Sequence, residues 1–145
     1  MFEQITDNGV IIAIIITSKF TKEGIEFFTP NDFSQQLGYM NRSKGYKIEA
    51  HSHKRVQHAV LQTHEVLYVK SGKVKIELYN DKHIFIEDRT LSAGDVILLA
   101  SGGHSIEMME DSELIEIKQG PYSNDDKISF TPLKNNDERK FSSEI

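Results

Sequence analysis

The stretch Lys73-Val74-Lys75-Ile76-Glu77-Leu78-Tyr79 decides the fold class, because charged and apolar residues alternate along it. Successive side chains of a β-strand point to opposite faces, so Val74, Ile76 and Leu78 share one face. The pattern therefore predicts a strand with one buried and one solvated face. Turn-forming residues flank this strand, with Ser71-Gly72 before it and a hairpin tip at Asn80-Asp81-Lys82-His83 after it.

Similar short runs, separated by turn residues, recur along most of the chain. They predict strands over Val10–Thr17, Ile25–Phe28, Leu37–Asn41, Gly45–His53, Glu65–Lys70, Lys73–Tyr79, His83–Glu87, Asp95–Leu99, His104–Met109 and Glu113–Gln119. One helical turn is expected over Asn31–Gln36, with Asn31 or Asp32 as its cap. About ten short strands without a long helical period predict an all-β sandwich or barrel.

The run from Val10 to Ile16 is apolar throughout. It predicts a strand that is buried on both faces, or one that pairs with a second subunit, because an exposed edge of this composition would aggregate. We therefore expect a homodimer, with strand exchange through Val10–Thr17 as one route.

Length and charge narrow the class of protein. A chain of 145 residues suits one domain, which we expect over residues 1–122 with its core at 37–120, followed by a polar tail over 123–145. The net charge of -5 argues against nucleic acid as a partner, because phosphate binding needs a basic surface. The N-terminus lacks the basic start of a signal peptide, and the first apolar run is too short to cross a bilayer. We expect a cytoplasmic protein without a membrane partner.

Histidines supply the strongest chemical signal in the sequence. His51 and His53 are two residues apart, so both imidazoles point the same way if this stretch is a strand. The spacing suits two ligands of one metal ion, and the alternative is a solvated pair on an edge strand. Because the chain has no cysteine, any metal site must use nitrogen and oxygen donors.

The glycines and acidic residues around this pair follow a known order. Five residues separate Gly45 from His51, and six separate Glu65 from Gly72. A second stretch begins at Gly94 and ends in Gly102-Gly103-His104. Over residues 37–120 the chain resembles the cupin superfamily, whose signature has Gly, His-x-His, Glu and Gly followed by a second motif that starts with Gly and ends in His.

The resemblance implies a fold and a metal site. The fold would be an all-β, double-stranded β-helix (jelly-roll) barrel. Its metal ligands would be His51, His53, Glu65 and His104. Three imidazoles and a carboxylate suit one divalent transition metal. This ligand set does not distinguish among Zn, Fe, Ni, Mn and Co. The alternative is a metal-free barrel whose histidines bind a ligand directly.

Two features depart from the cupin pattern. Residues 54–64 separate His53 from Glu65, which is a longer spacing than the family has and predicts a longer loop at the barrel mouth. Ala100 stands where the family has proline, His104 comes one residue early, and Met108 stands where the family has asparagine. The geometry around His104 is therefore less constrained by the resemblance than that around the His51–His53 pair.

The runs Gly94–His104 and Lys118–Tyr122 look like those of small cupins that are often met near surface-sugar biosynthesis genes. This resemblance does not indicate which reaction the protein would catalyse. It implies a small polar partner that is sugar-derived, and it leaves open whether the protein is an enzyme. One hypothesis is a metal-dependent isomerase, epimerase or dioxygenase. The other is a non-catalytic binding or sensing module, or an accessory subunit of polysaccharide biosynthesis.

The candidate catalytic residues are Glu49, His58, Gln119 and Tyr39. On a regular strand Glu49 faces the same side as His51, whereas a bulge would turn it outward. His58 belongs to the long loop and is either a lid residue or a surface residue. Gln119 would end an inward row with Ile115 and Ile117, and the Tyr39 phenol either reaches the pocket or only packs. His64 and His83 are expected at the surface, and Met108 in the core.

Overall fold

A computed structural model describes residues 1–121, 123 and 127–133, and the described residues form strands and no helix. The strands are β1 (Phe2–Asp7), β2 (Val10–Ile16), β3 (Gly24–Phe27), β4 (Gly38–Asn41), β5 (Glu65–Ser71), β6 (Lys73–Tyr79), β7 (Phe85–Ser92), β8 (Val96–Leu99), β9 (Gly103–Met108) and β10 (Glu113–Lys118). The all-β prediction is confirmed. No helix that could cross a membrane occurs in this part of the chain.

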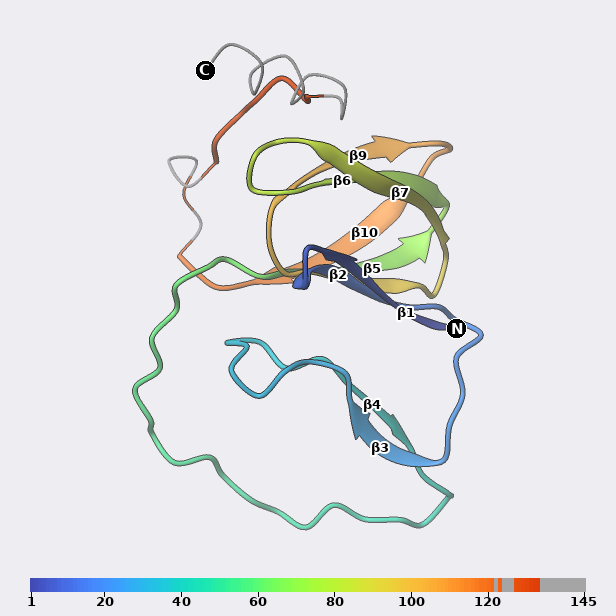
Figure 1. Cartoon of the computed structure of the whole chain (residues 1–145). Coiled ribbons are helices and arrows are strands. Elements are labelled where there is room, and N and C mark those ends of the chain that lie inside the picture. The colour runs from blue at the N-terminus through green and yellow to red at the C-terminus, as the bar shows by residue number, and fades with distance from the viewer. Residues whose placement is uncertain (122, 124–126, 134–145) are drawn as a thin grey trace.

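Two antiparallel sheets lie face to face, and a hairpin stands apart from them (Figure 1). The larger sheet has the order β1-β2-β8-β5-β10, and the smaller has the order β7-β6-β9. The hairpin β3–β4 pairs only with itself among the described strands. The two sheets do not close into a barrel, so the structure gives an open two-sheet arrangement rather than the predicted closed jelly roll.

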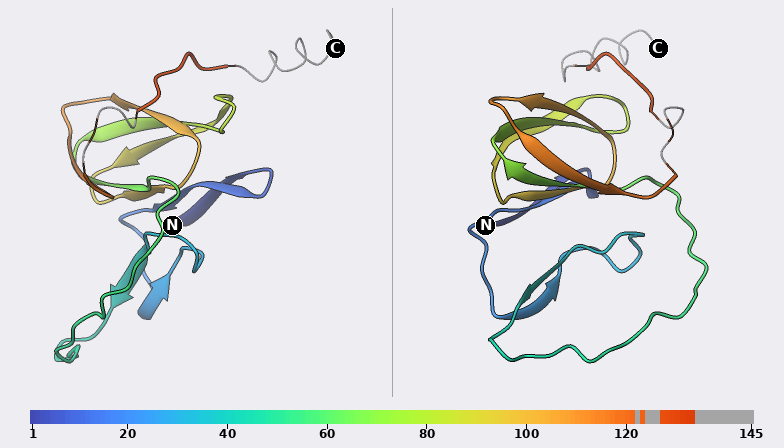
Figure 2. Two further views of the ribbon diagram at one scale, coloured as in Figure 1. Left: turned by 90° about the vertical axis from the view of Figure 1, so that its left-hand side faces the viewer. Right: turned by 180° about the vertical axis from the view of Figure 1, so that it is seen from behind.

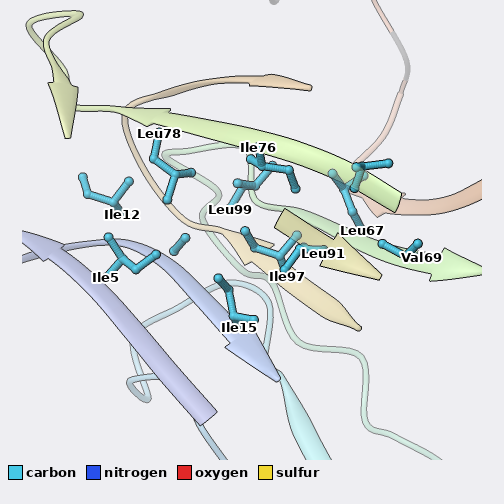
Figure 3. Packing of buried hydrophobic residues seen from close by; sticks show 12 residues of the cluster. Ile5, Ile12, Ile15, Leu67, Val69, Ile76, Leu78, Leu91, Ile97 and Leu99 are labelled. Carbon is cyan, nitrogen blue, oxygen red and sulfur yellow. The ribbon is translucent and has the colours of Figure 1, made fainter. Parts of the chain in front are cut away.

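The core lies between the two sheets, as the alternation along β6 predicts. Val74, Ile76 and Leu78 are fully buried. Leu67 of β5 and Ile97 of β8 meet them from the larger sheet (Figure 3). Burial of these apolar side chains is the main source of stability for such a sandwich.

Strand β2 occupies the interior of the larger sheet. It pairs with β1 on one side and with β8 on the other, and Ile12 to Ile16 are all buried. The prediction of a strand buried on both faces is confirmed. Because both edges of β2 are occupied within one chain, this strand does not offer a route to a second subunit.

Two local predictions were wrong, and one strand was missed. The stretch Gly45–His53 is not a strand, since none of the described strands pairs with it and every residue from 41 to 63 is exposed. The turn after Pro30 is not helical. The Phe33 N–H donates to the Pro30 carbonyl at 3.1 Å, and the Gln36 side-chain amide donates to the carbonyls of Pro30 and Phe33, both at 2.9 Å. Strand β1 was missed because its residues do not alternate cleanly. Most of the predicted tail, including residues 134–145, lies outside the described residues.

An ion pair ties the two sheets together at one edge. Arg89 of β7 donates from Nε to the two carboxylate oxygens of Glu3 in β1, at 3.0 and 3.2 Å. This hydrogen bond lowers the pKa of Glu3, and burial of the carboxyl partly opposes it. A lowered folded-state pKa stabilises the fold above the unfolded pKa, and that contribution is lost as the pH falls through the folded value.

We therefore expect Glu3→Gln to lower the free energy of unfolding at pH 7 by about 0.2–1 kcal/mol. The difference from the parent protein should shrink as the pH falls from about 4.3, the ordinary pKa of glutamate, through the lower pKa of folded Glu3. Urea unfolding at a series of pH values measures this, with the exposed Glu23→Gln as control. A pH-independent difference would show that the loss comes from packing and not from charge.

Candidate active site

Glu65 and His104 form a close pair between the two sheets. Glu65 opens β5 and shares a face with Leu67 and Val69, which are buried in the core. His104 lies opposite Leu78 in the β9–β6 register, so its side chain also points inward. The two side chains meet with 3.0 Å between His104 Nε2 and Glu65 Oε2. The structure thus brings together two of the four predicted metal ligands.

Charge and burial set the state of this pair. The hydrogen bond from His104 lowers the pKa of Glu65, burial opposes it, and the Lys118 ammonium lowers it further. Lys118 Nζ lies 3.8 Å from Glu65 Oε1. Glu65 is therefore a carboxylate at neutral pH, and it holds the proton of His104 on Nε2. An imidazole oriented in this way by a carboxylate is suited to general acid–base chemistry.

A cavity of about 780 Å³ opens beside the pair. Residues of β5, β9 and the turn before β9 form one part of its wall, and residues 127–130 and 132 of the tail form another. The Phe130 ring stacks on His83 with 3.9 Å between ring centroids and meets Tyr79 edge-on at 5.3 Å. The tail therefore covers one face of the His83 ring, and His83 is half-buried at the hairpin tip where a solvated position was expected. Sequence reasoning missed this wall because the contacts join distant parts of the chain.

The turn before His104 is tightly packed. Gly102 has φ +69°, and a side chain there would overlap the carbonyl oxygen of Tyr79. The next residue, Gly103, lies against the Phe130 ring. Gly102 is thus required sterically for the path that carries His104 into the cavity, and Gly103 leaves room for the Phe130 ring.

Gly102→Ala should lower the free energy of unfolding by about 1–3 kcal/mol or more, because it combines left-handed strain with a backbone overlap. Gly9→Ala is the matched control, since Gly9 has φ +79° with nothing within 4 Å of an added Cβ. Thermal and urea unfolding of both variants separate the two causes. Equal losses would mean that backbone strain alone accounts for the effect.

The other two predicted ligands lie elsewhere. His51 and His53 belong to the extended, exposed segment that joins β4 to β5. Their ring centroids are 5.2 Å apart. His51 donates from Nδ1 to the carbonyl oxygen of Glu49 at 2.8 Å, which leaves Nε2 as the nitrogen able to bind a metal.

The predicted metal site is therefore divided into two halves. Among the described residues, no group of three or more histidine or acidic side chains is placed to hold one ion. The pair on the extended segment and the Glu65–His104 pair do not share a coordination centre in this arrangement. The four donors fit a divalent ion by their chemistry but not by their placement within one chain.

Three of the catalytic candidates lie on or before the extended segment. Glu49 is exposed and pairs with Lys47 at 3.6 Å. His58 is exposed on the same segment. Tyr39 in β4 packs edge-on against Phe20, with 4.9 Å between ring centroids. The structure does not bring any of these side chains to the cavity.

Gln119 fastens the start of β5 to the turn after Pro30. Its side-chain oxygen accepts the backbone N–H of His64 at 2.9 Å, and its nitrogen donates to Ser34 Oγ at 2.8 Å. His64 is buried against Phe33, and burial lowers the pKa of its imidazole, so the expected surface position was wrong. Gln119 therefore has a structural role here.

The side chains of β9 and β10 also correct the prediction. Leu114 pairs with Val69 and faces inward, so Ile115 and Ile117 face outward, at 49% and 56% exposed. The expected inward row was the wrong face of β10. Met108 faces the interior but is 52% exposed, because no described strand covers it.

Comparison of the chain with models of known protein families, with curated proteins and with solved structures finds no match.

Proposed function

We propose that this chain is a small-molecule enzyme of the cupin superfamily, and that its active site is the cavity beside Glu65 and His104. The observation that carries the proposal is the 3.0 Å contact between these two side chains at the cavity wall. A partly buried carboxylate that orients an imidazole toward an open cavity is typical of a site that transfers protons.

The chemistry that suits this pair is proton transfer next to a carbonyl group. Glu65 holds the Nε2 proton of His104, so Nδ1 of the same ring is the nitrogen that takes a proton from a substrate carbon. The electrons of that C–H bond become a C=C bond, and the carbonyl becomes an enolate. Return of the proton to the other face of the same carbon gives epimerisation. Its return to the former carbonyl carbon gives isomerisation, provided that the proton of the adjacent hydroxyl group moves to the enolate oxygen so that this hydroxyl becomes the new carbonyl. Lys118 adds positive charge beside Glu65, at 3.8 Å from Oε1.

The proposed substrate class is a small sugar or sugar nucleotide that carries a ketone. The cupin resemblance and the sugar-locus resemblance of Gly94–His104 and Lys118–Tyr122 support this class. The open pair of antiparallel sheets supports the assignment to cupins, since it supplies much of a jelly roll. A homodimer belongs to the same proposal.

The divalent metal remains a prediction from the resemblance. In one chain the donors do not fit a single ion, so no step of the chemistry above is routed through a metal, and the dioxygenase alternative rests on the resemblance alone. Elemental analysis of untagged protein, compared with His51→Ala, tests the prediction. We expect the parent protein to retain a divalent ion that the variant loses.

Proton exchange tests the proposed activity without knowledge of the product. The protein is incubated in D₂O with a panel of keto sugars and sugar nucleotides, with and without added Fe, Mn, Ni or Zn, and deuterium uptake at carbon is followed by NMR. We expect uptake next to the carbonyl in at least one compound. No uptake in any compound with any metal would overturn the proposal.

A binding module is the second candidate, and the tail favours it. Residues 127–130 and 132 form one part of the cavity wall, an arrangement that retains a ligand without requiring turnover. A rise in melting temperature with a sugar nucleotide, unaccompanied by deuterium uptake, would favour this alternative over the enzyme.

A further inference from the structure

We propose that residues 127–133 form a strap that opens and closes beside the candidate active site, with Phe130 as its latch. A ligand enters the cavity while the strap is open and is held there when the strap closes. The role of the strap rests on the proposed function, but its opening follows from contacts that do not involve the reaction.

The strap forms part of the wall of the cavity. Residues 127–130 and 132 line the same cavity as Glu65 and His104. Figure 2 shows the strap in red beside the smaller sheet, on the side of the molecule opposite the β3–β4 hairpin. The hydrogen bond from His104 does most to lower the pKa of Glu65, and the charge of Lys127 also lowers it. The closed strap therefore brings a cation to the Glu65–His104 pair.

A single side chain fastens the strap to the sheets. Phe130 is half-buried, whereas the other residues of the strap are exposed, Ile128 at 79%. The Phe130 ring stacks on His83, with 3.9 Å between centroids and 5° between ring planes, and meets Tyr79 edge-on at 5.3 Å. Aromatic contacts of this kind are modest in strength. Closure of the strap therefore depends on one ring.

Two backbone hydrogen bonds hold the end of the strap. The Leu133 N–H donates to the carbonyl oxygen of His83 at 2.9 Å, and the Phe85 N–H donates to the carbonyl oxygen of Leu133 at 3.1 Å. Within the described residues, no backbone hydrogen bond joins residues 127–132 to the two sheets. Segments with few buried apolar contacts and exposed backbone open locally at low free energy. The strap is such a segment, so it opens while both sheets stay folded.

The latch fits a slot next to His104. Gly103 directly precedes His104 in β9, and a Cβ added to Gly103 would lie 2.6 Å from Cζ of Phe130. The ring can therefore dock only where residue 103 has no side chain. Gly103 is not among the glycines with positive φ, so alanine at this position would block the slot without straining the backbone. Closure of the strap is thus linked to the strand that carries His104.

A wall that opens serves the proposed chemistry in two ways. Closure of a segment beside reacting groups excludes water from them and retains the ligand. A ligand that contacts the strap binds the closed form more tightly than the open form, so it shifts the equilibrium toward closure. The open form then admits the substrate and releases the product.

Amide hydrogen exchange of the full chain measures opening without any substrate. Opening breaks the two strap hydrogen bonds and frees the amides of Phe85 and Leu133. After correction for intrinsic rates, we expect these amides to exchange about 10²-fold faster than the amide of Ile76 in the core. Exchange as slow as that of Ile76 would mean that the strap opens only when the whole sandwich unfolds, which would overturn the proposal.

Two variants release the latch in different ways. Phe130→Ala removes the ring, and Gly103→Ala fills its slot. Each should speed exchange of the Phe85 and Leu133 amides about 10-fold, and unchanged exchange in the core would show that the fold is intact. Ile128→Ala is the matched control on the same strap and should leave both amides unchanged. Parent-like exchange in both latch variants would remove Phe130 from the role of latch.

A disulfide tests whether the strap must open for a ligand to enter. Ile84 and Leu133 are partners in a parallel β-bridge, and neighbouring strands lie about 4.7–4.9 Å apart, a separation that a disulfide can span. The chain has no other cysteine. In the oxidised Ile84→Cys, Leu133→Cys variant we expect deuterium uptake by the panel of keto sugars and sugar nucleotides to fall about 10-fold or more. Reduction should restore it, and Ile84→Cys alone is the control.

The outcomes separate the strap from the proposed function. Equal deuterium uptake by the oxidised and reduced variants would mean that ligands enter past a closed strap, which would overturn the need for opening. No uptake by the parent protein with any compound would contradict the proposed enzyme, whereas fast exchange of the Phe85 and Leu133 amides would still establish that the strap opens.

Discussion

Replacement of His104 by Gln should lower kcat/KM for proton exchange by about 10²–10⁴-fold, the usual contribution of a general base. Glutamine keeps a hydrogen-bond donor for Glu65 but has no lone pair that can take a proton from carbon near neutral pH. The side chain lies at the surface of the cavity, so the fold should tolerate the change. Deuterium uptake by the compound that reacts best with the parent protein measures the effect.

Two further variants test whether His104 is the base and whether Glu65 only orients it. Glu65→Gln removes the charge that orients His104 and should cause a smaller loss, because the imidazole itself remains to take the proton. Glu107→Gln is the matched control, since it lies on the same strand and its side chain faces the opposite way. A His104→Gln variant that exchanges protons as fast as the parent would remove His104 from the mechanism.

Local alternation was enough to predict the strands that build the core. Along β6 the inward residues Val74, Ile76 and Leu78 differ from their neighbours in polarity, and the structure buries all three. Alternation was not enough for β10, where Leu114, Ile115 and Ile117 put apolar residues on both faces. Only the register with β5 decides which face is inward, and register depends on residues far away in the sequence.

In the candidate site, too, the sequence predicted some residues correctly and others depended on contacts with distant parts of the chain. The order of motifs pointed to Glu65 and His104, and the structure brings them together at 3.0 Å. The same order pointed to His51 and His53, whose strand pattern needs a neighbouring strand before it can form. A sequence pattern states that a segment suits a strand, but it does not state which chain supplies the partner. The roles of Gln119 and Phe130 were hidden for a related reason, since their contacts join the end of the chain to its middle.

Ile76→Ala should lower the free energy of unfolding by about 2–5 kcal/mol. Ile76 lies at the middle of the smaller sheet's central strand, and it is fully buried in the cluster formed by both sheets (Figure 3). Truncation removes apolar area and leaves a cavity, because the neighbouring strands are held by their own hydrogen bonds and cannot collapse into the space. Urea unfolding followed by circular dichroism measures the loss.

The size of this loss distinguishes a well-packed sandwich from a loose one. The matched control is Ile128→Ala, because Ile128 is 79% exposed and its truncation removes the same atoms from a solvated position. We expect the control to change the free energy of unfolding by no more than about 0.5 kcal/mol. Ile76→Val removes one methyl group and should cost about 0.5–1.5 kcal/mol, so the three variants should rank by the buried volume they remove. A loss at Ile76 as small as that at Ile128 would mean that the two sheets do not pack as tightly as their buried residues indicate.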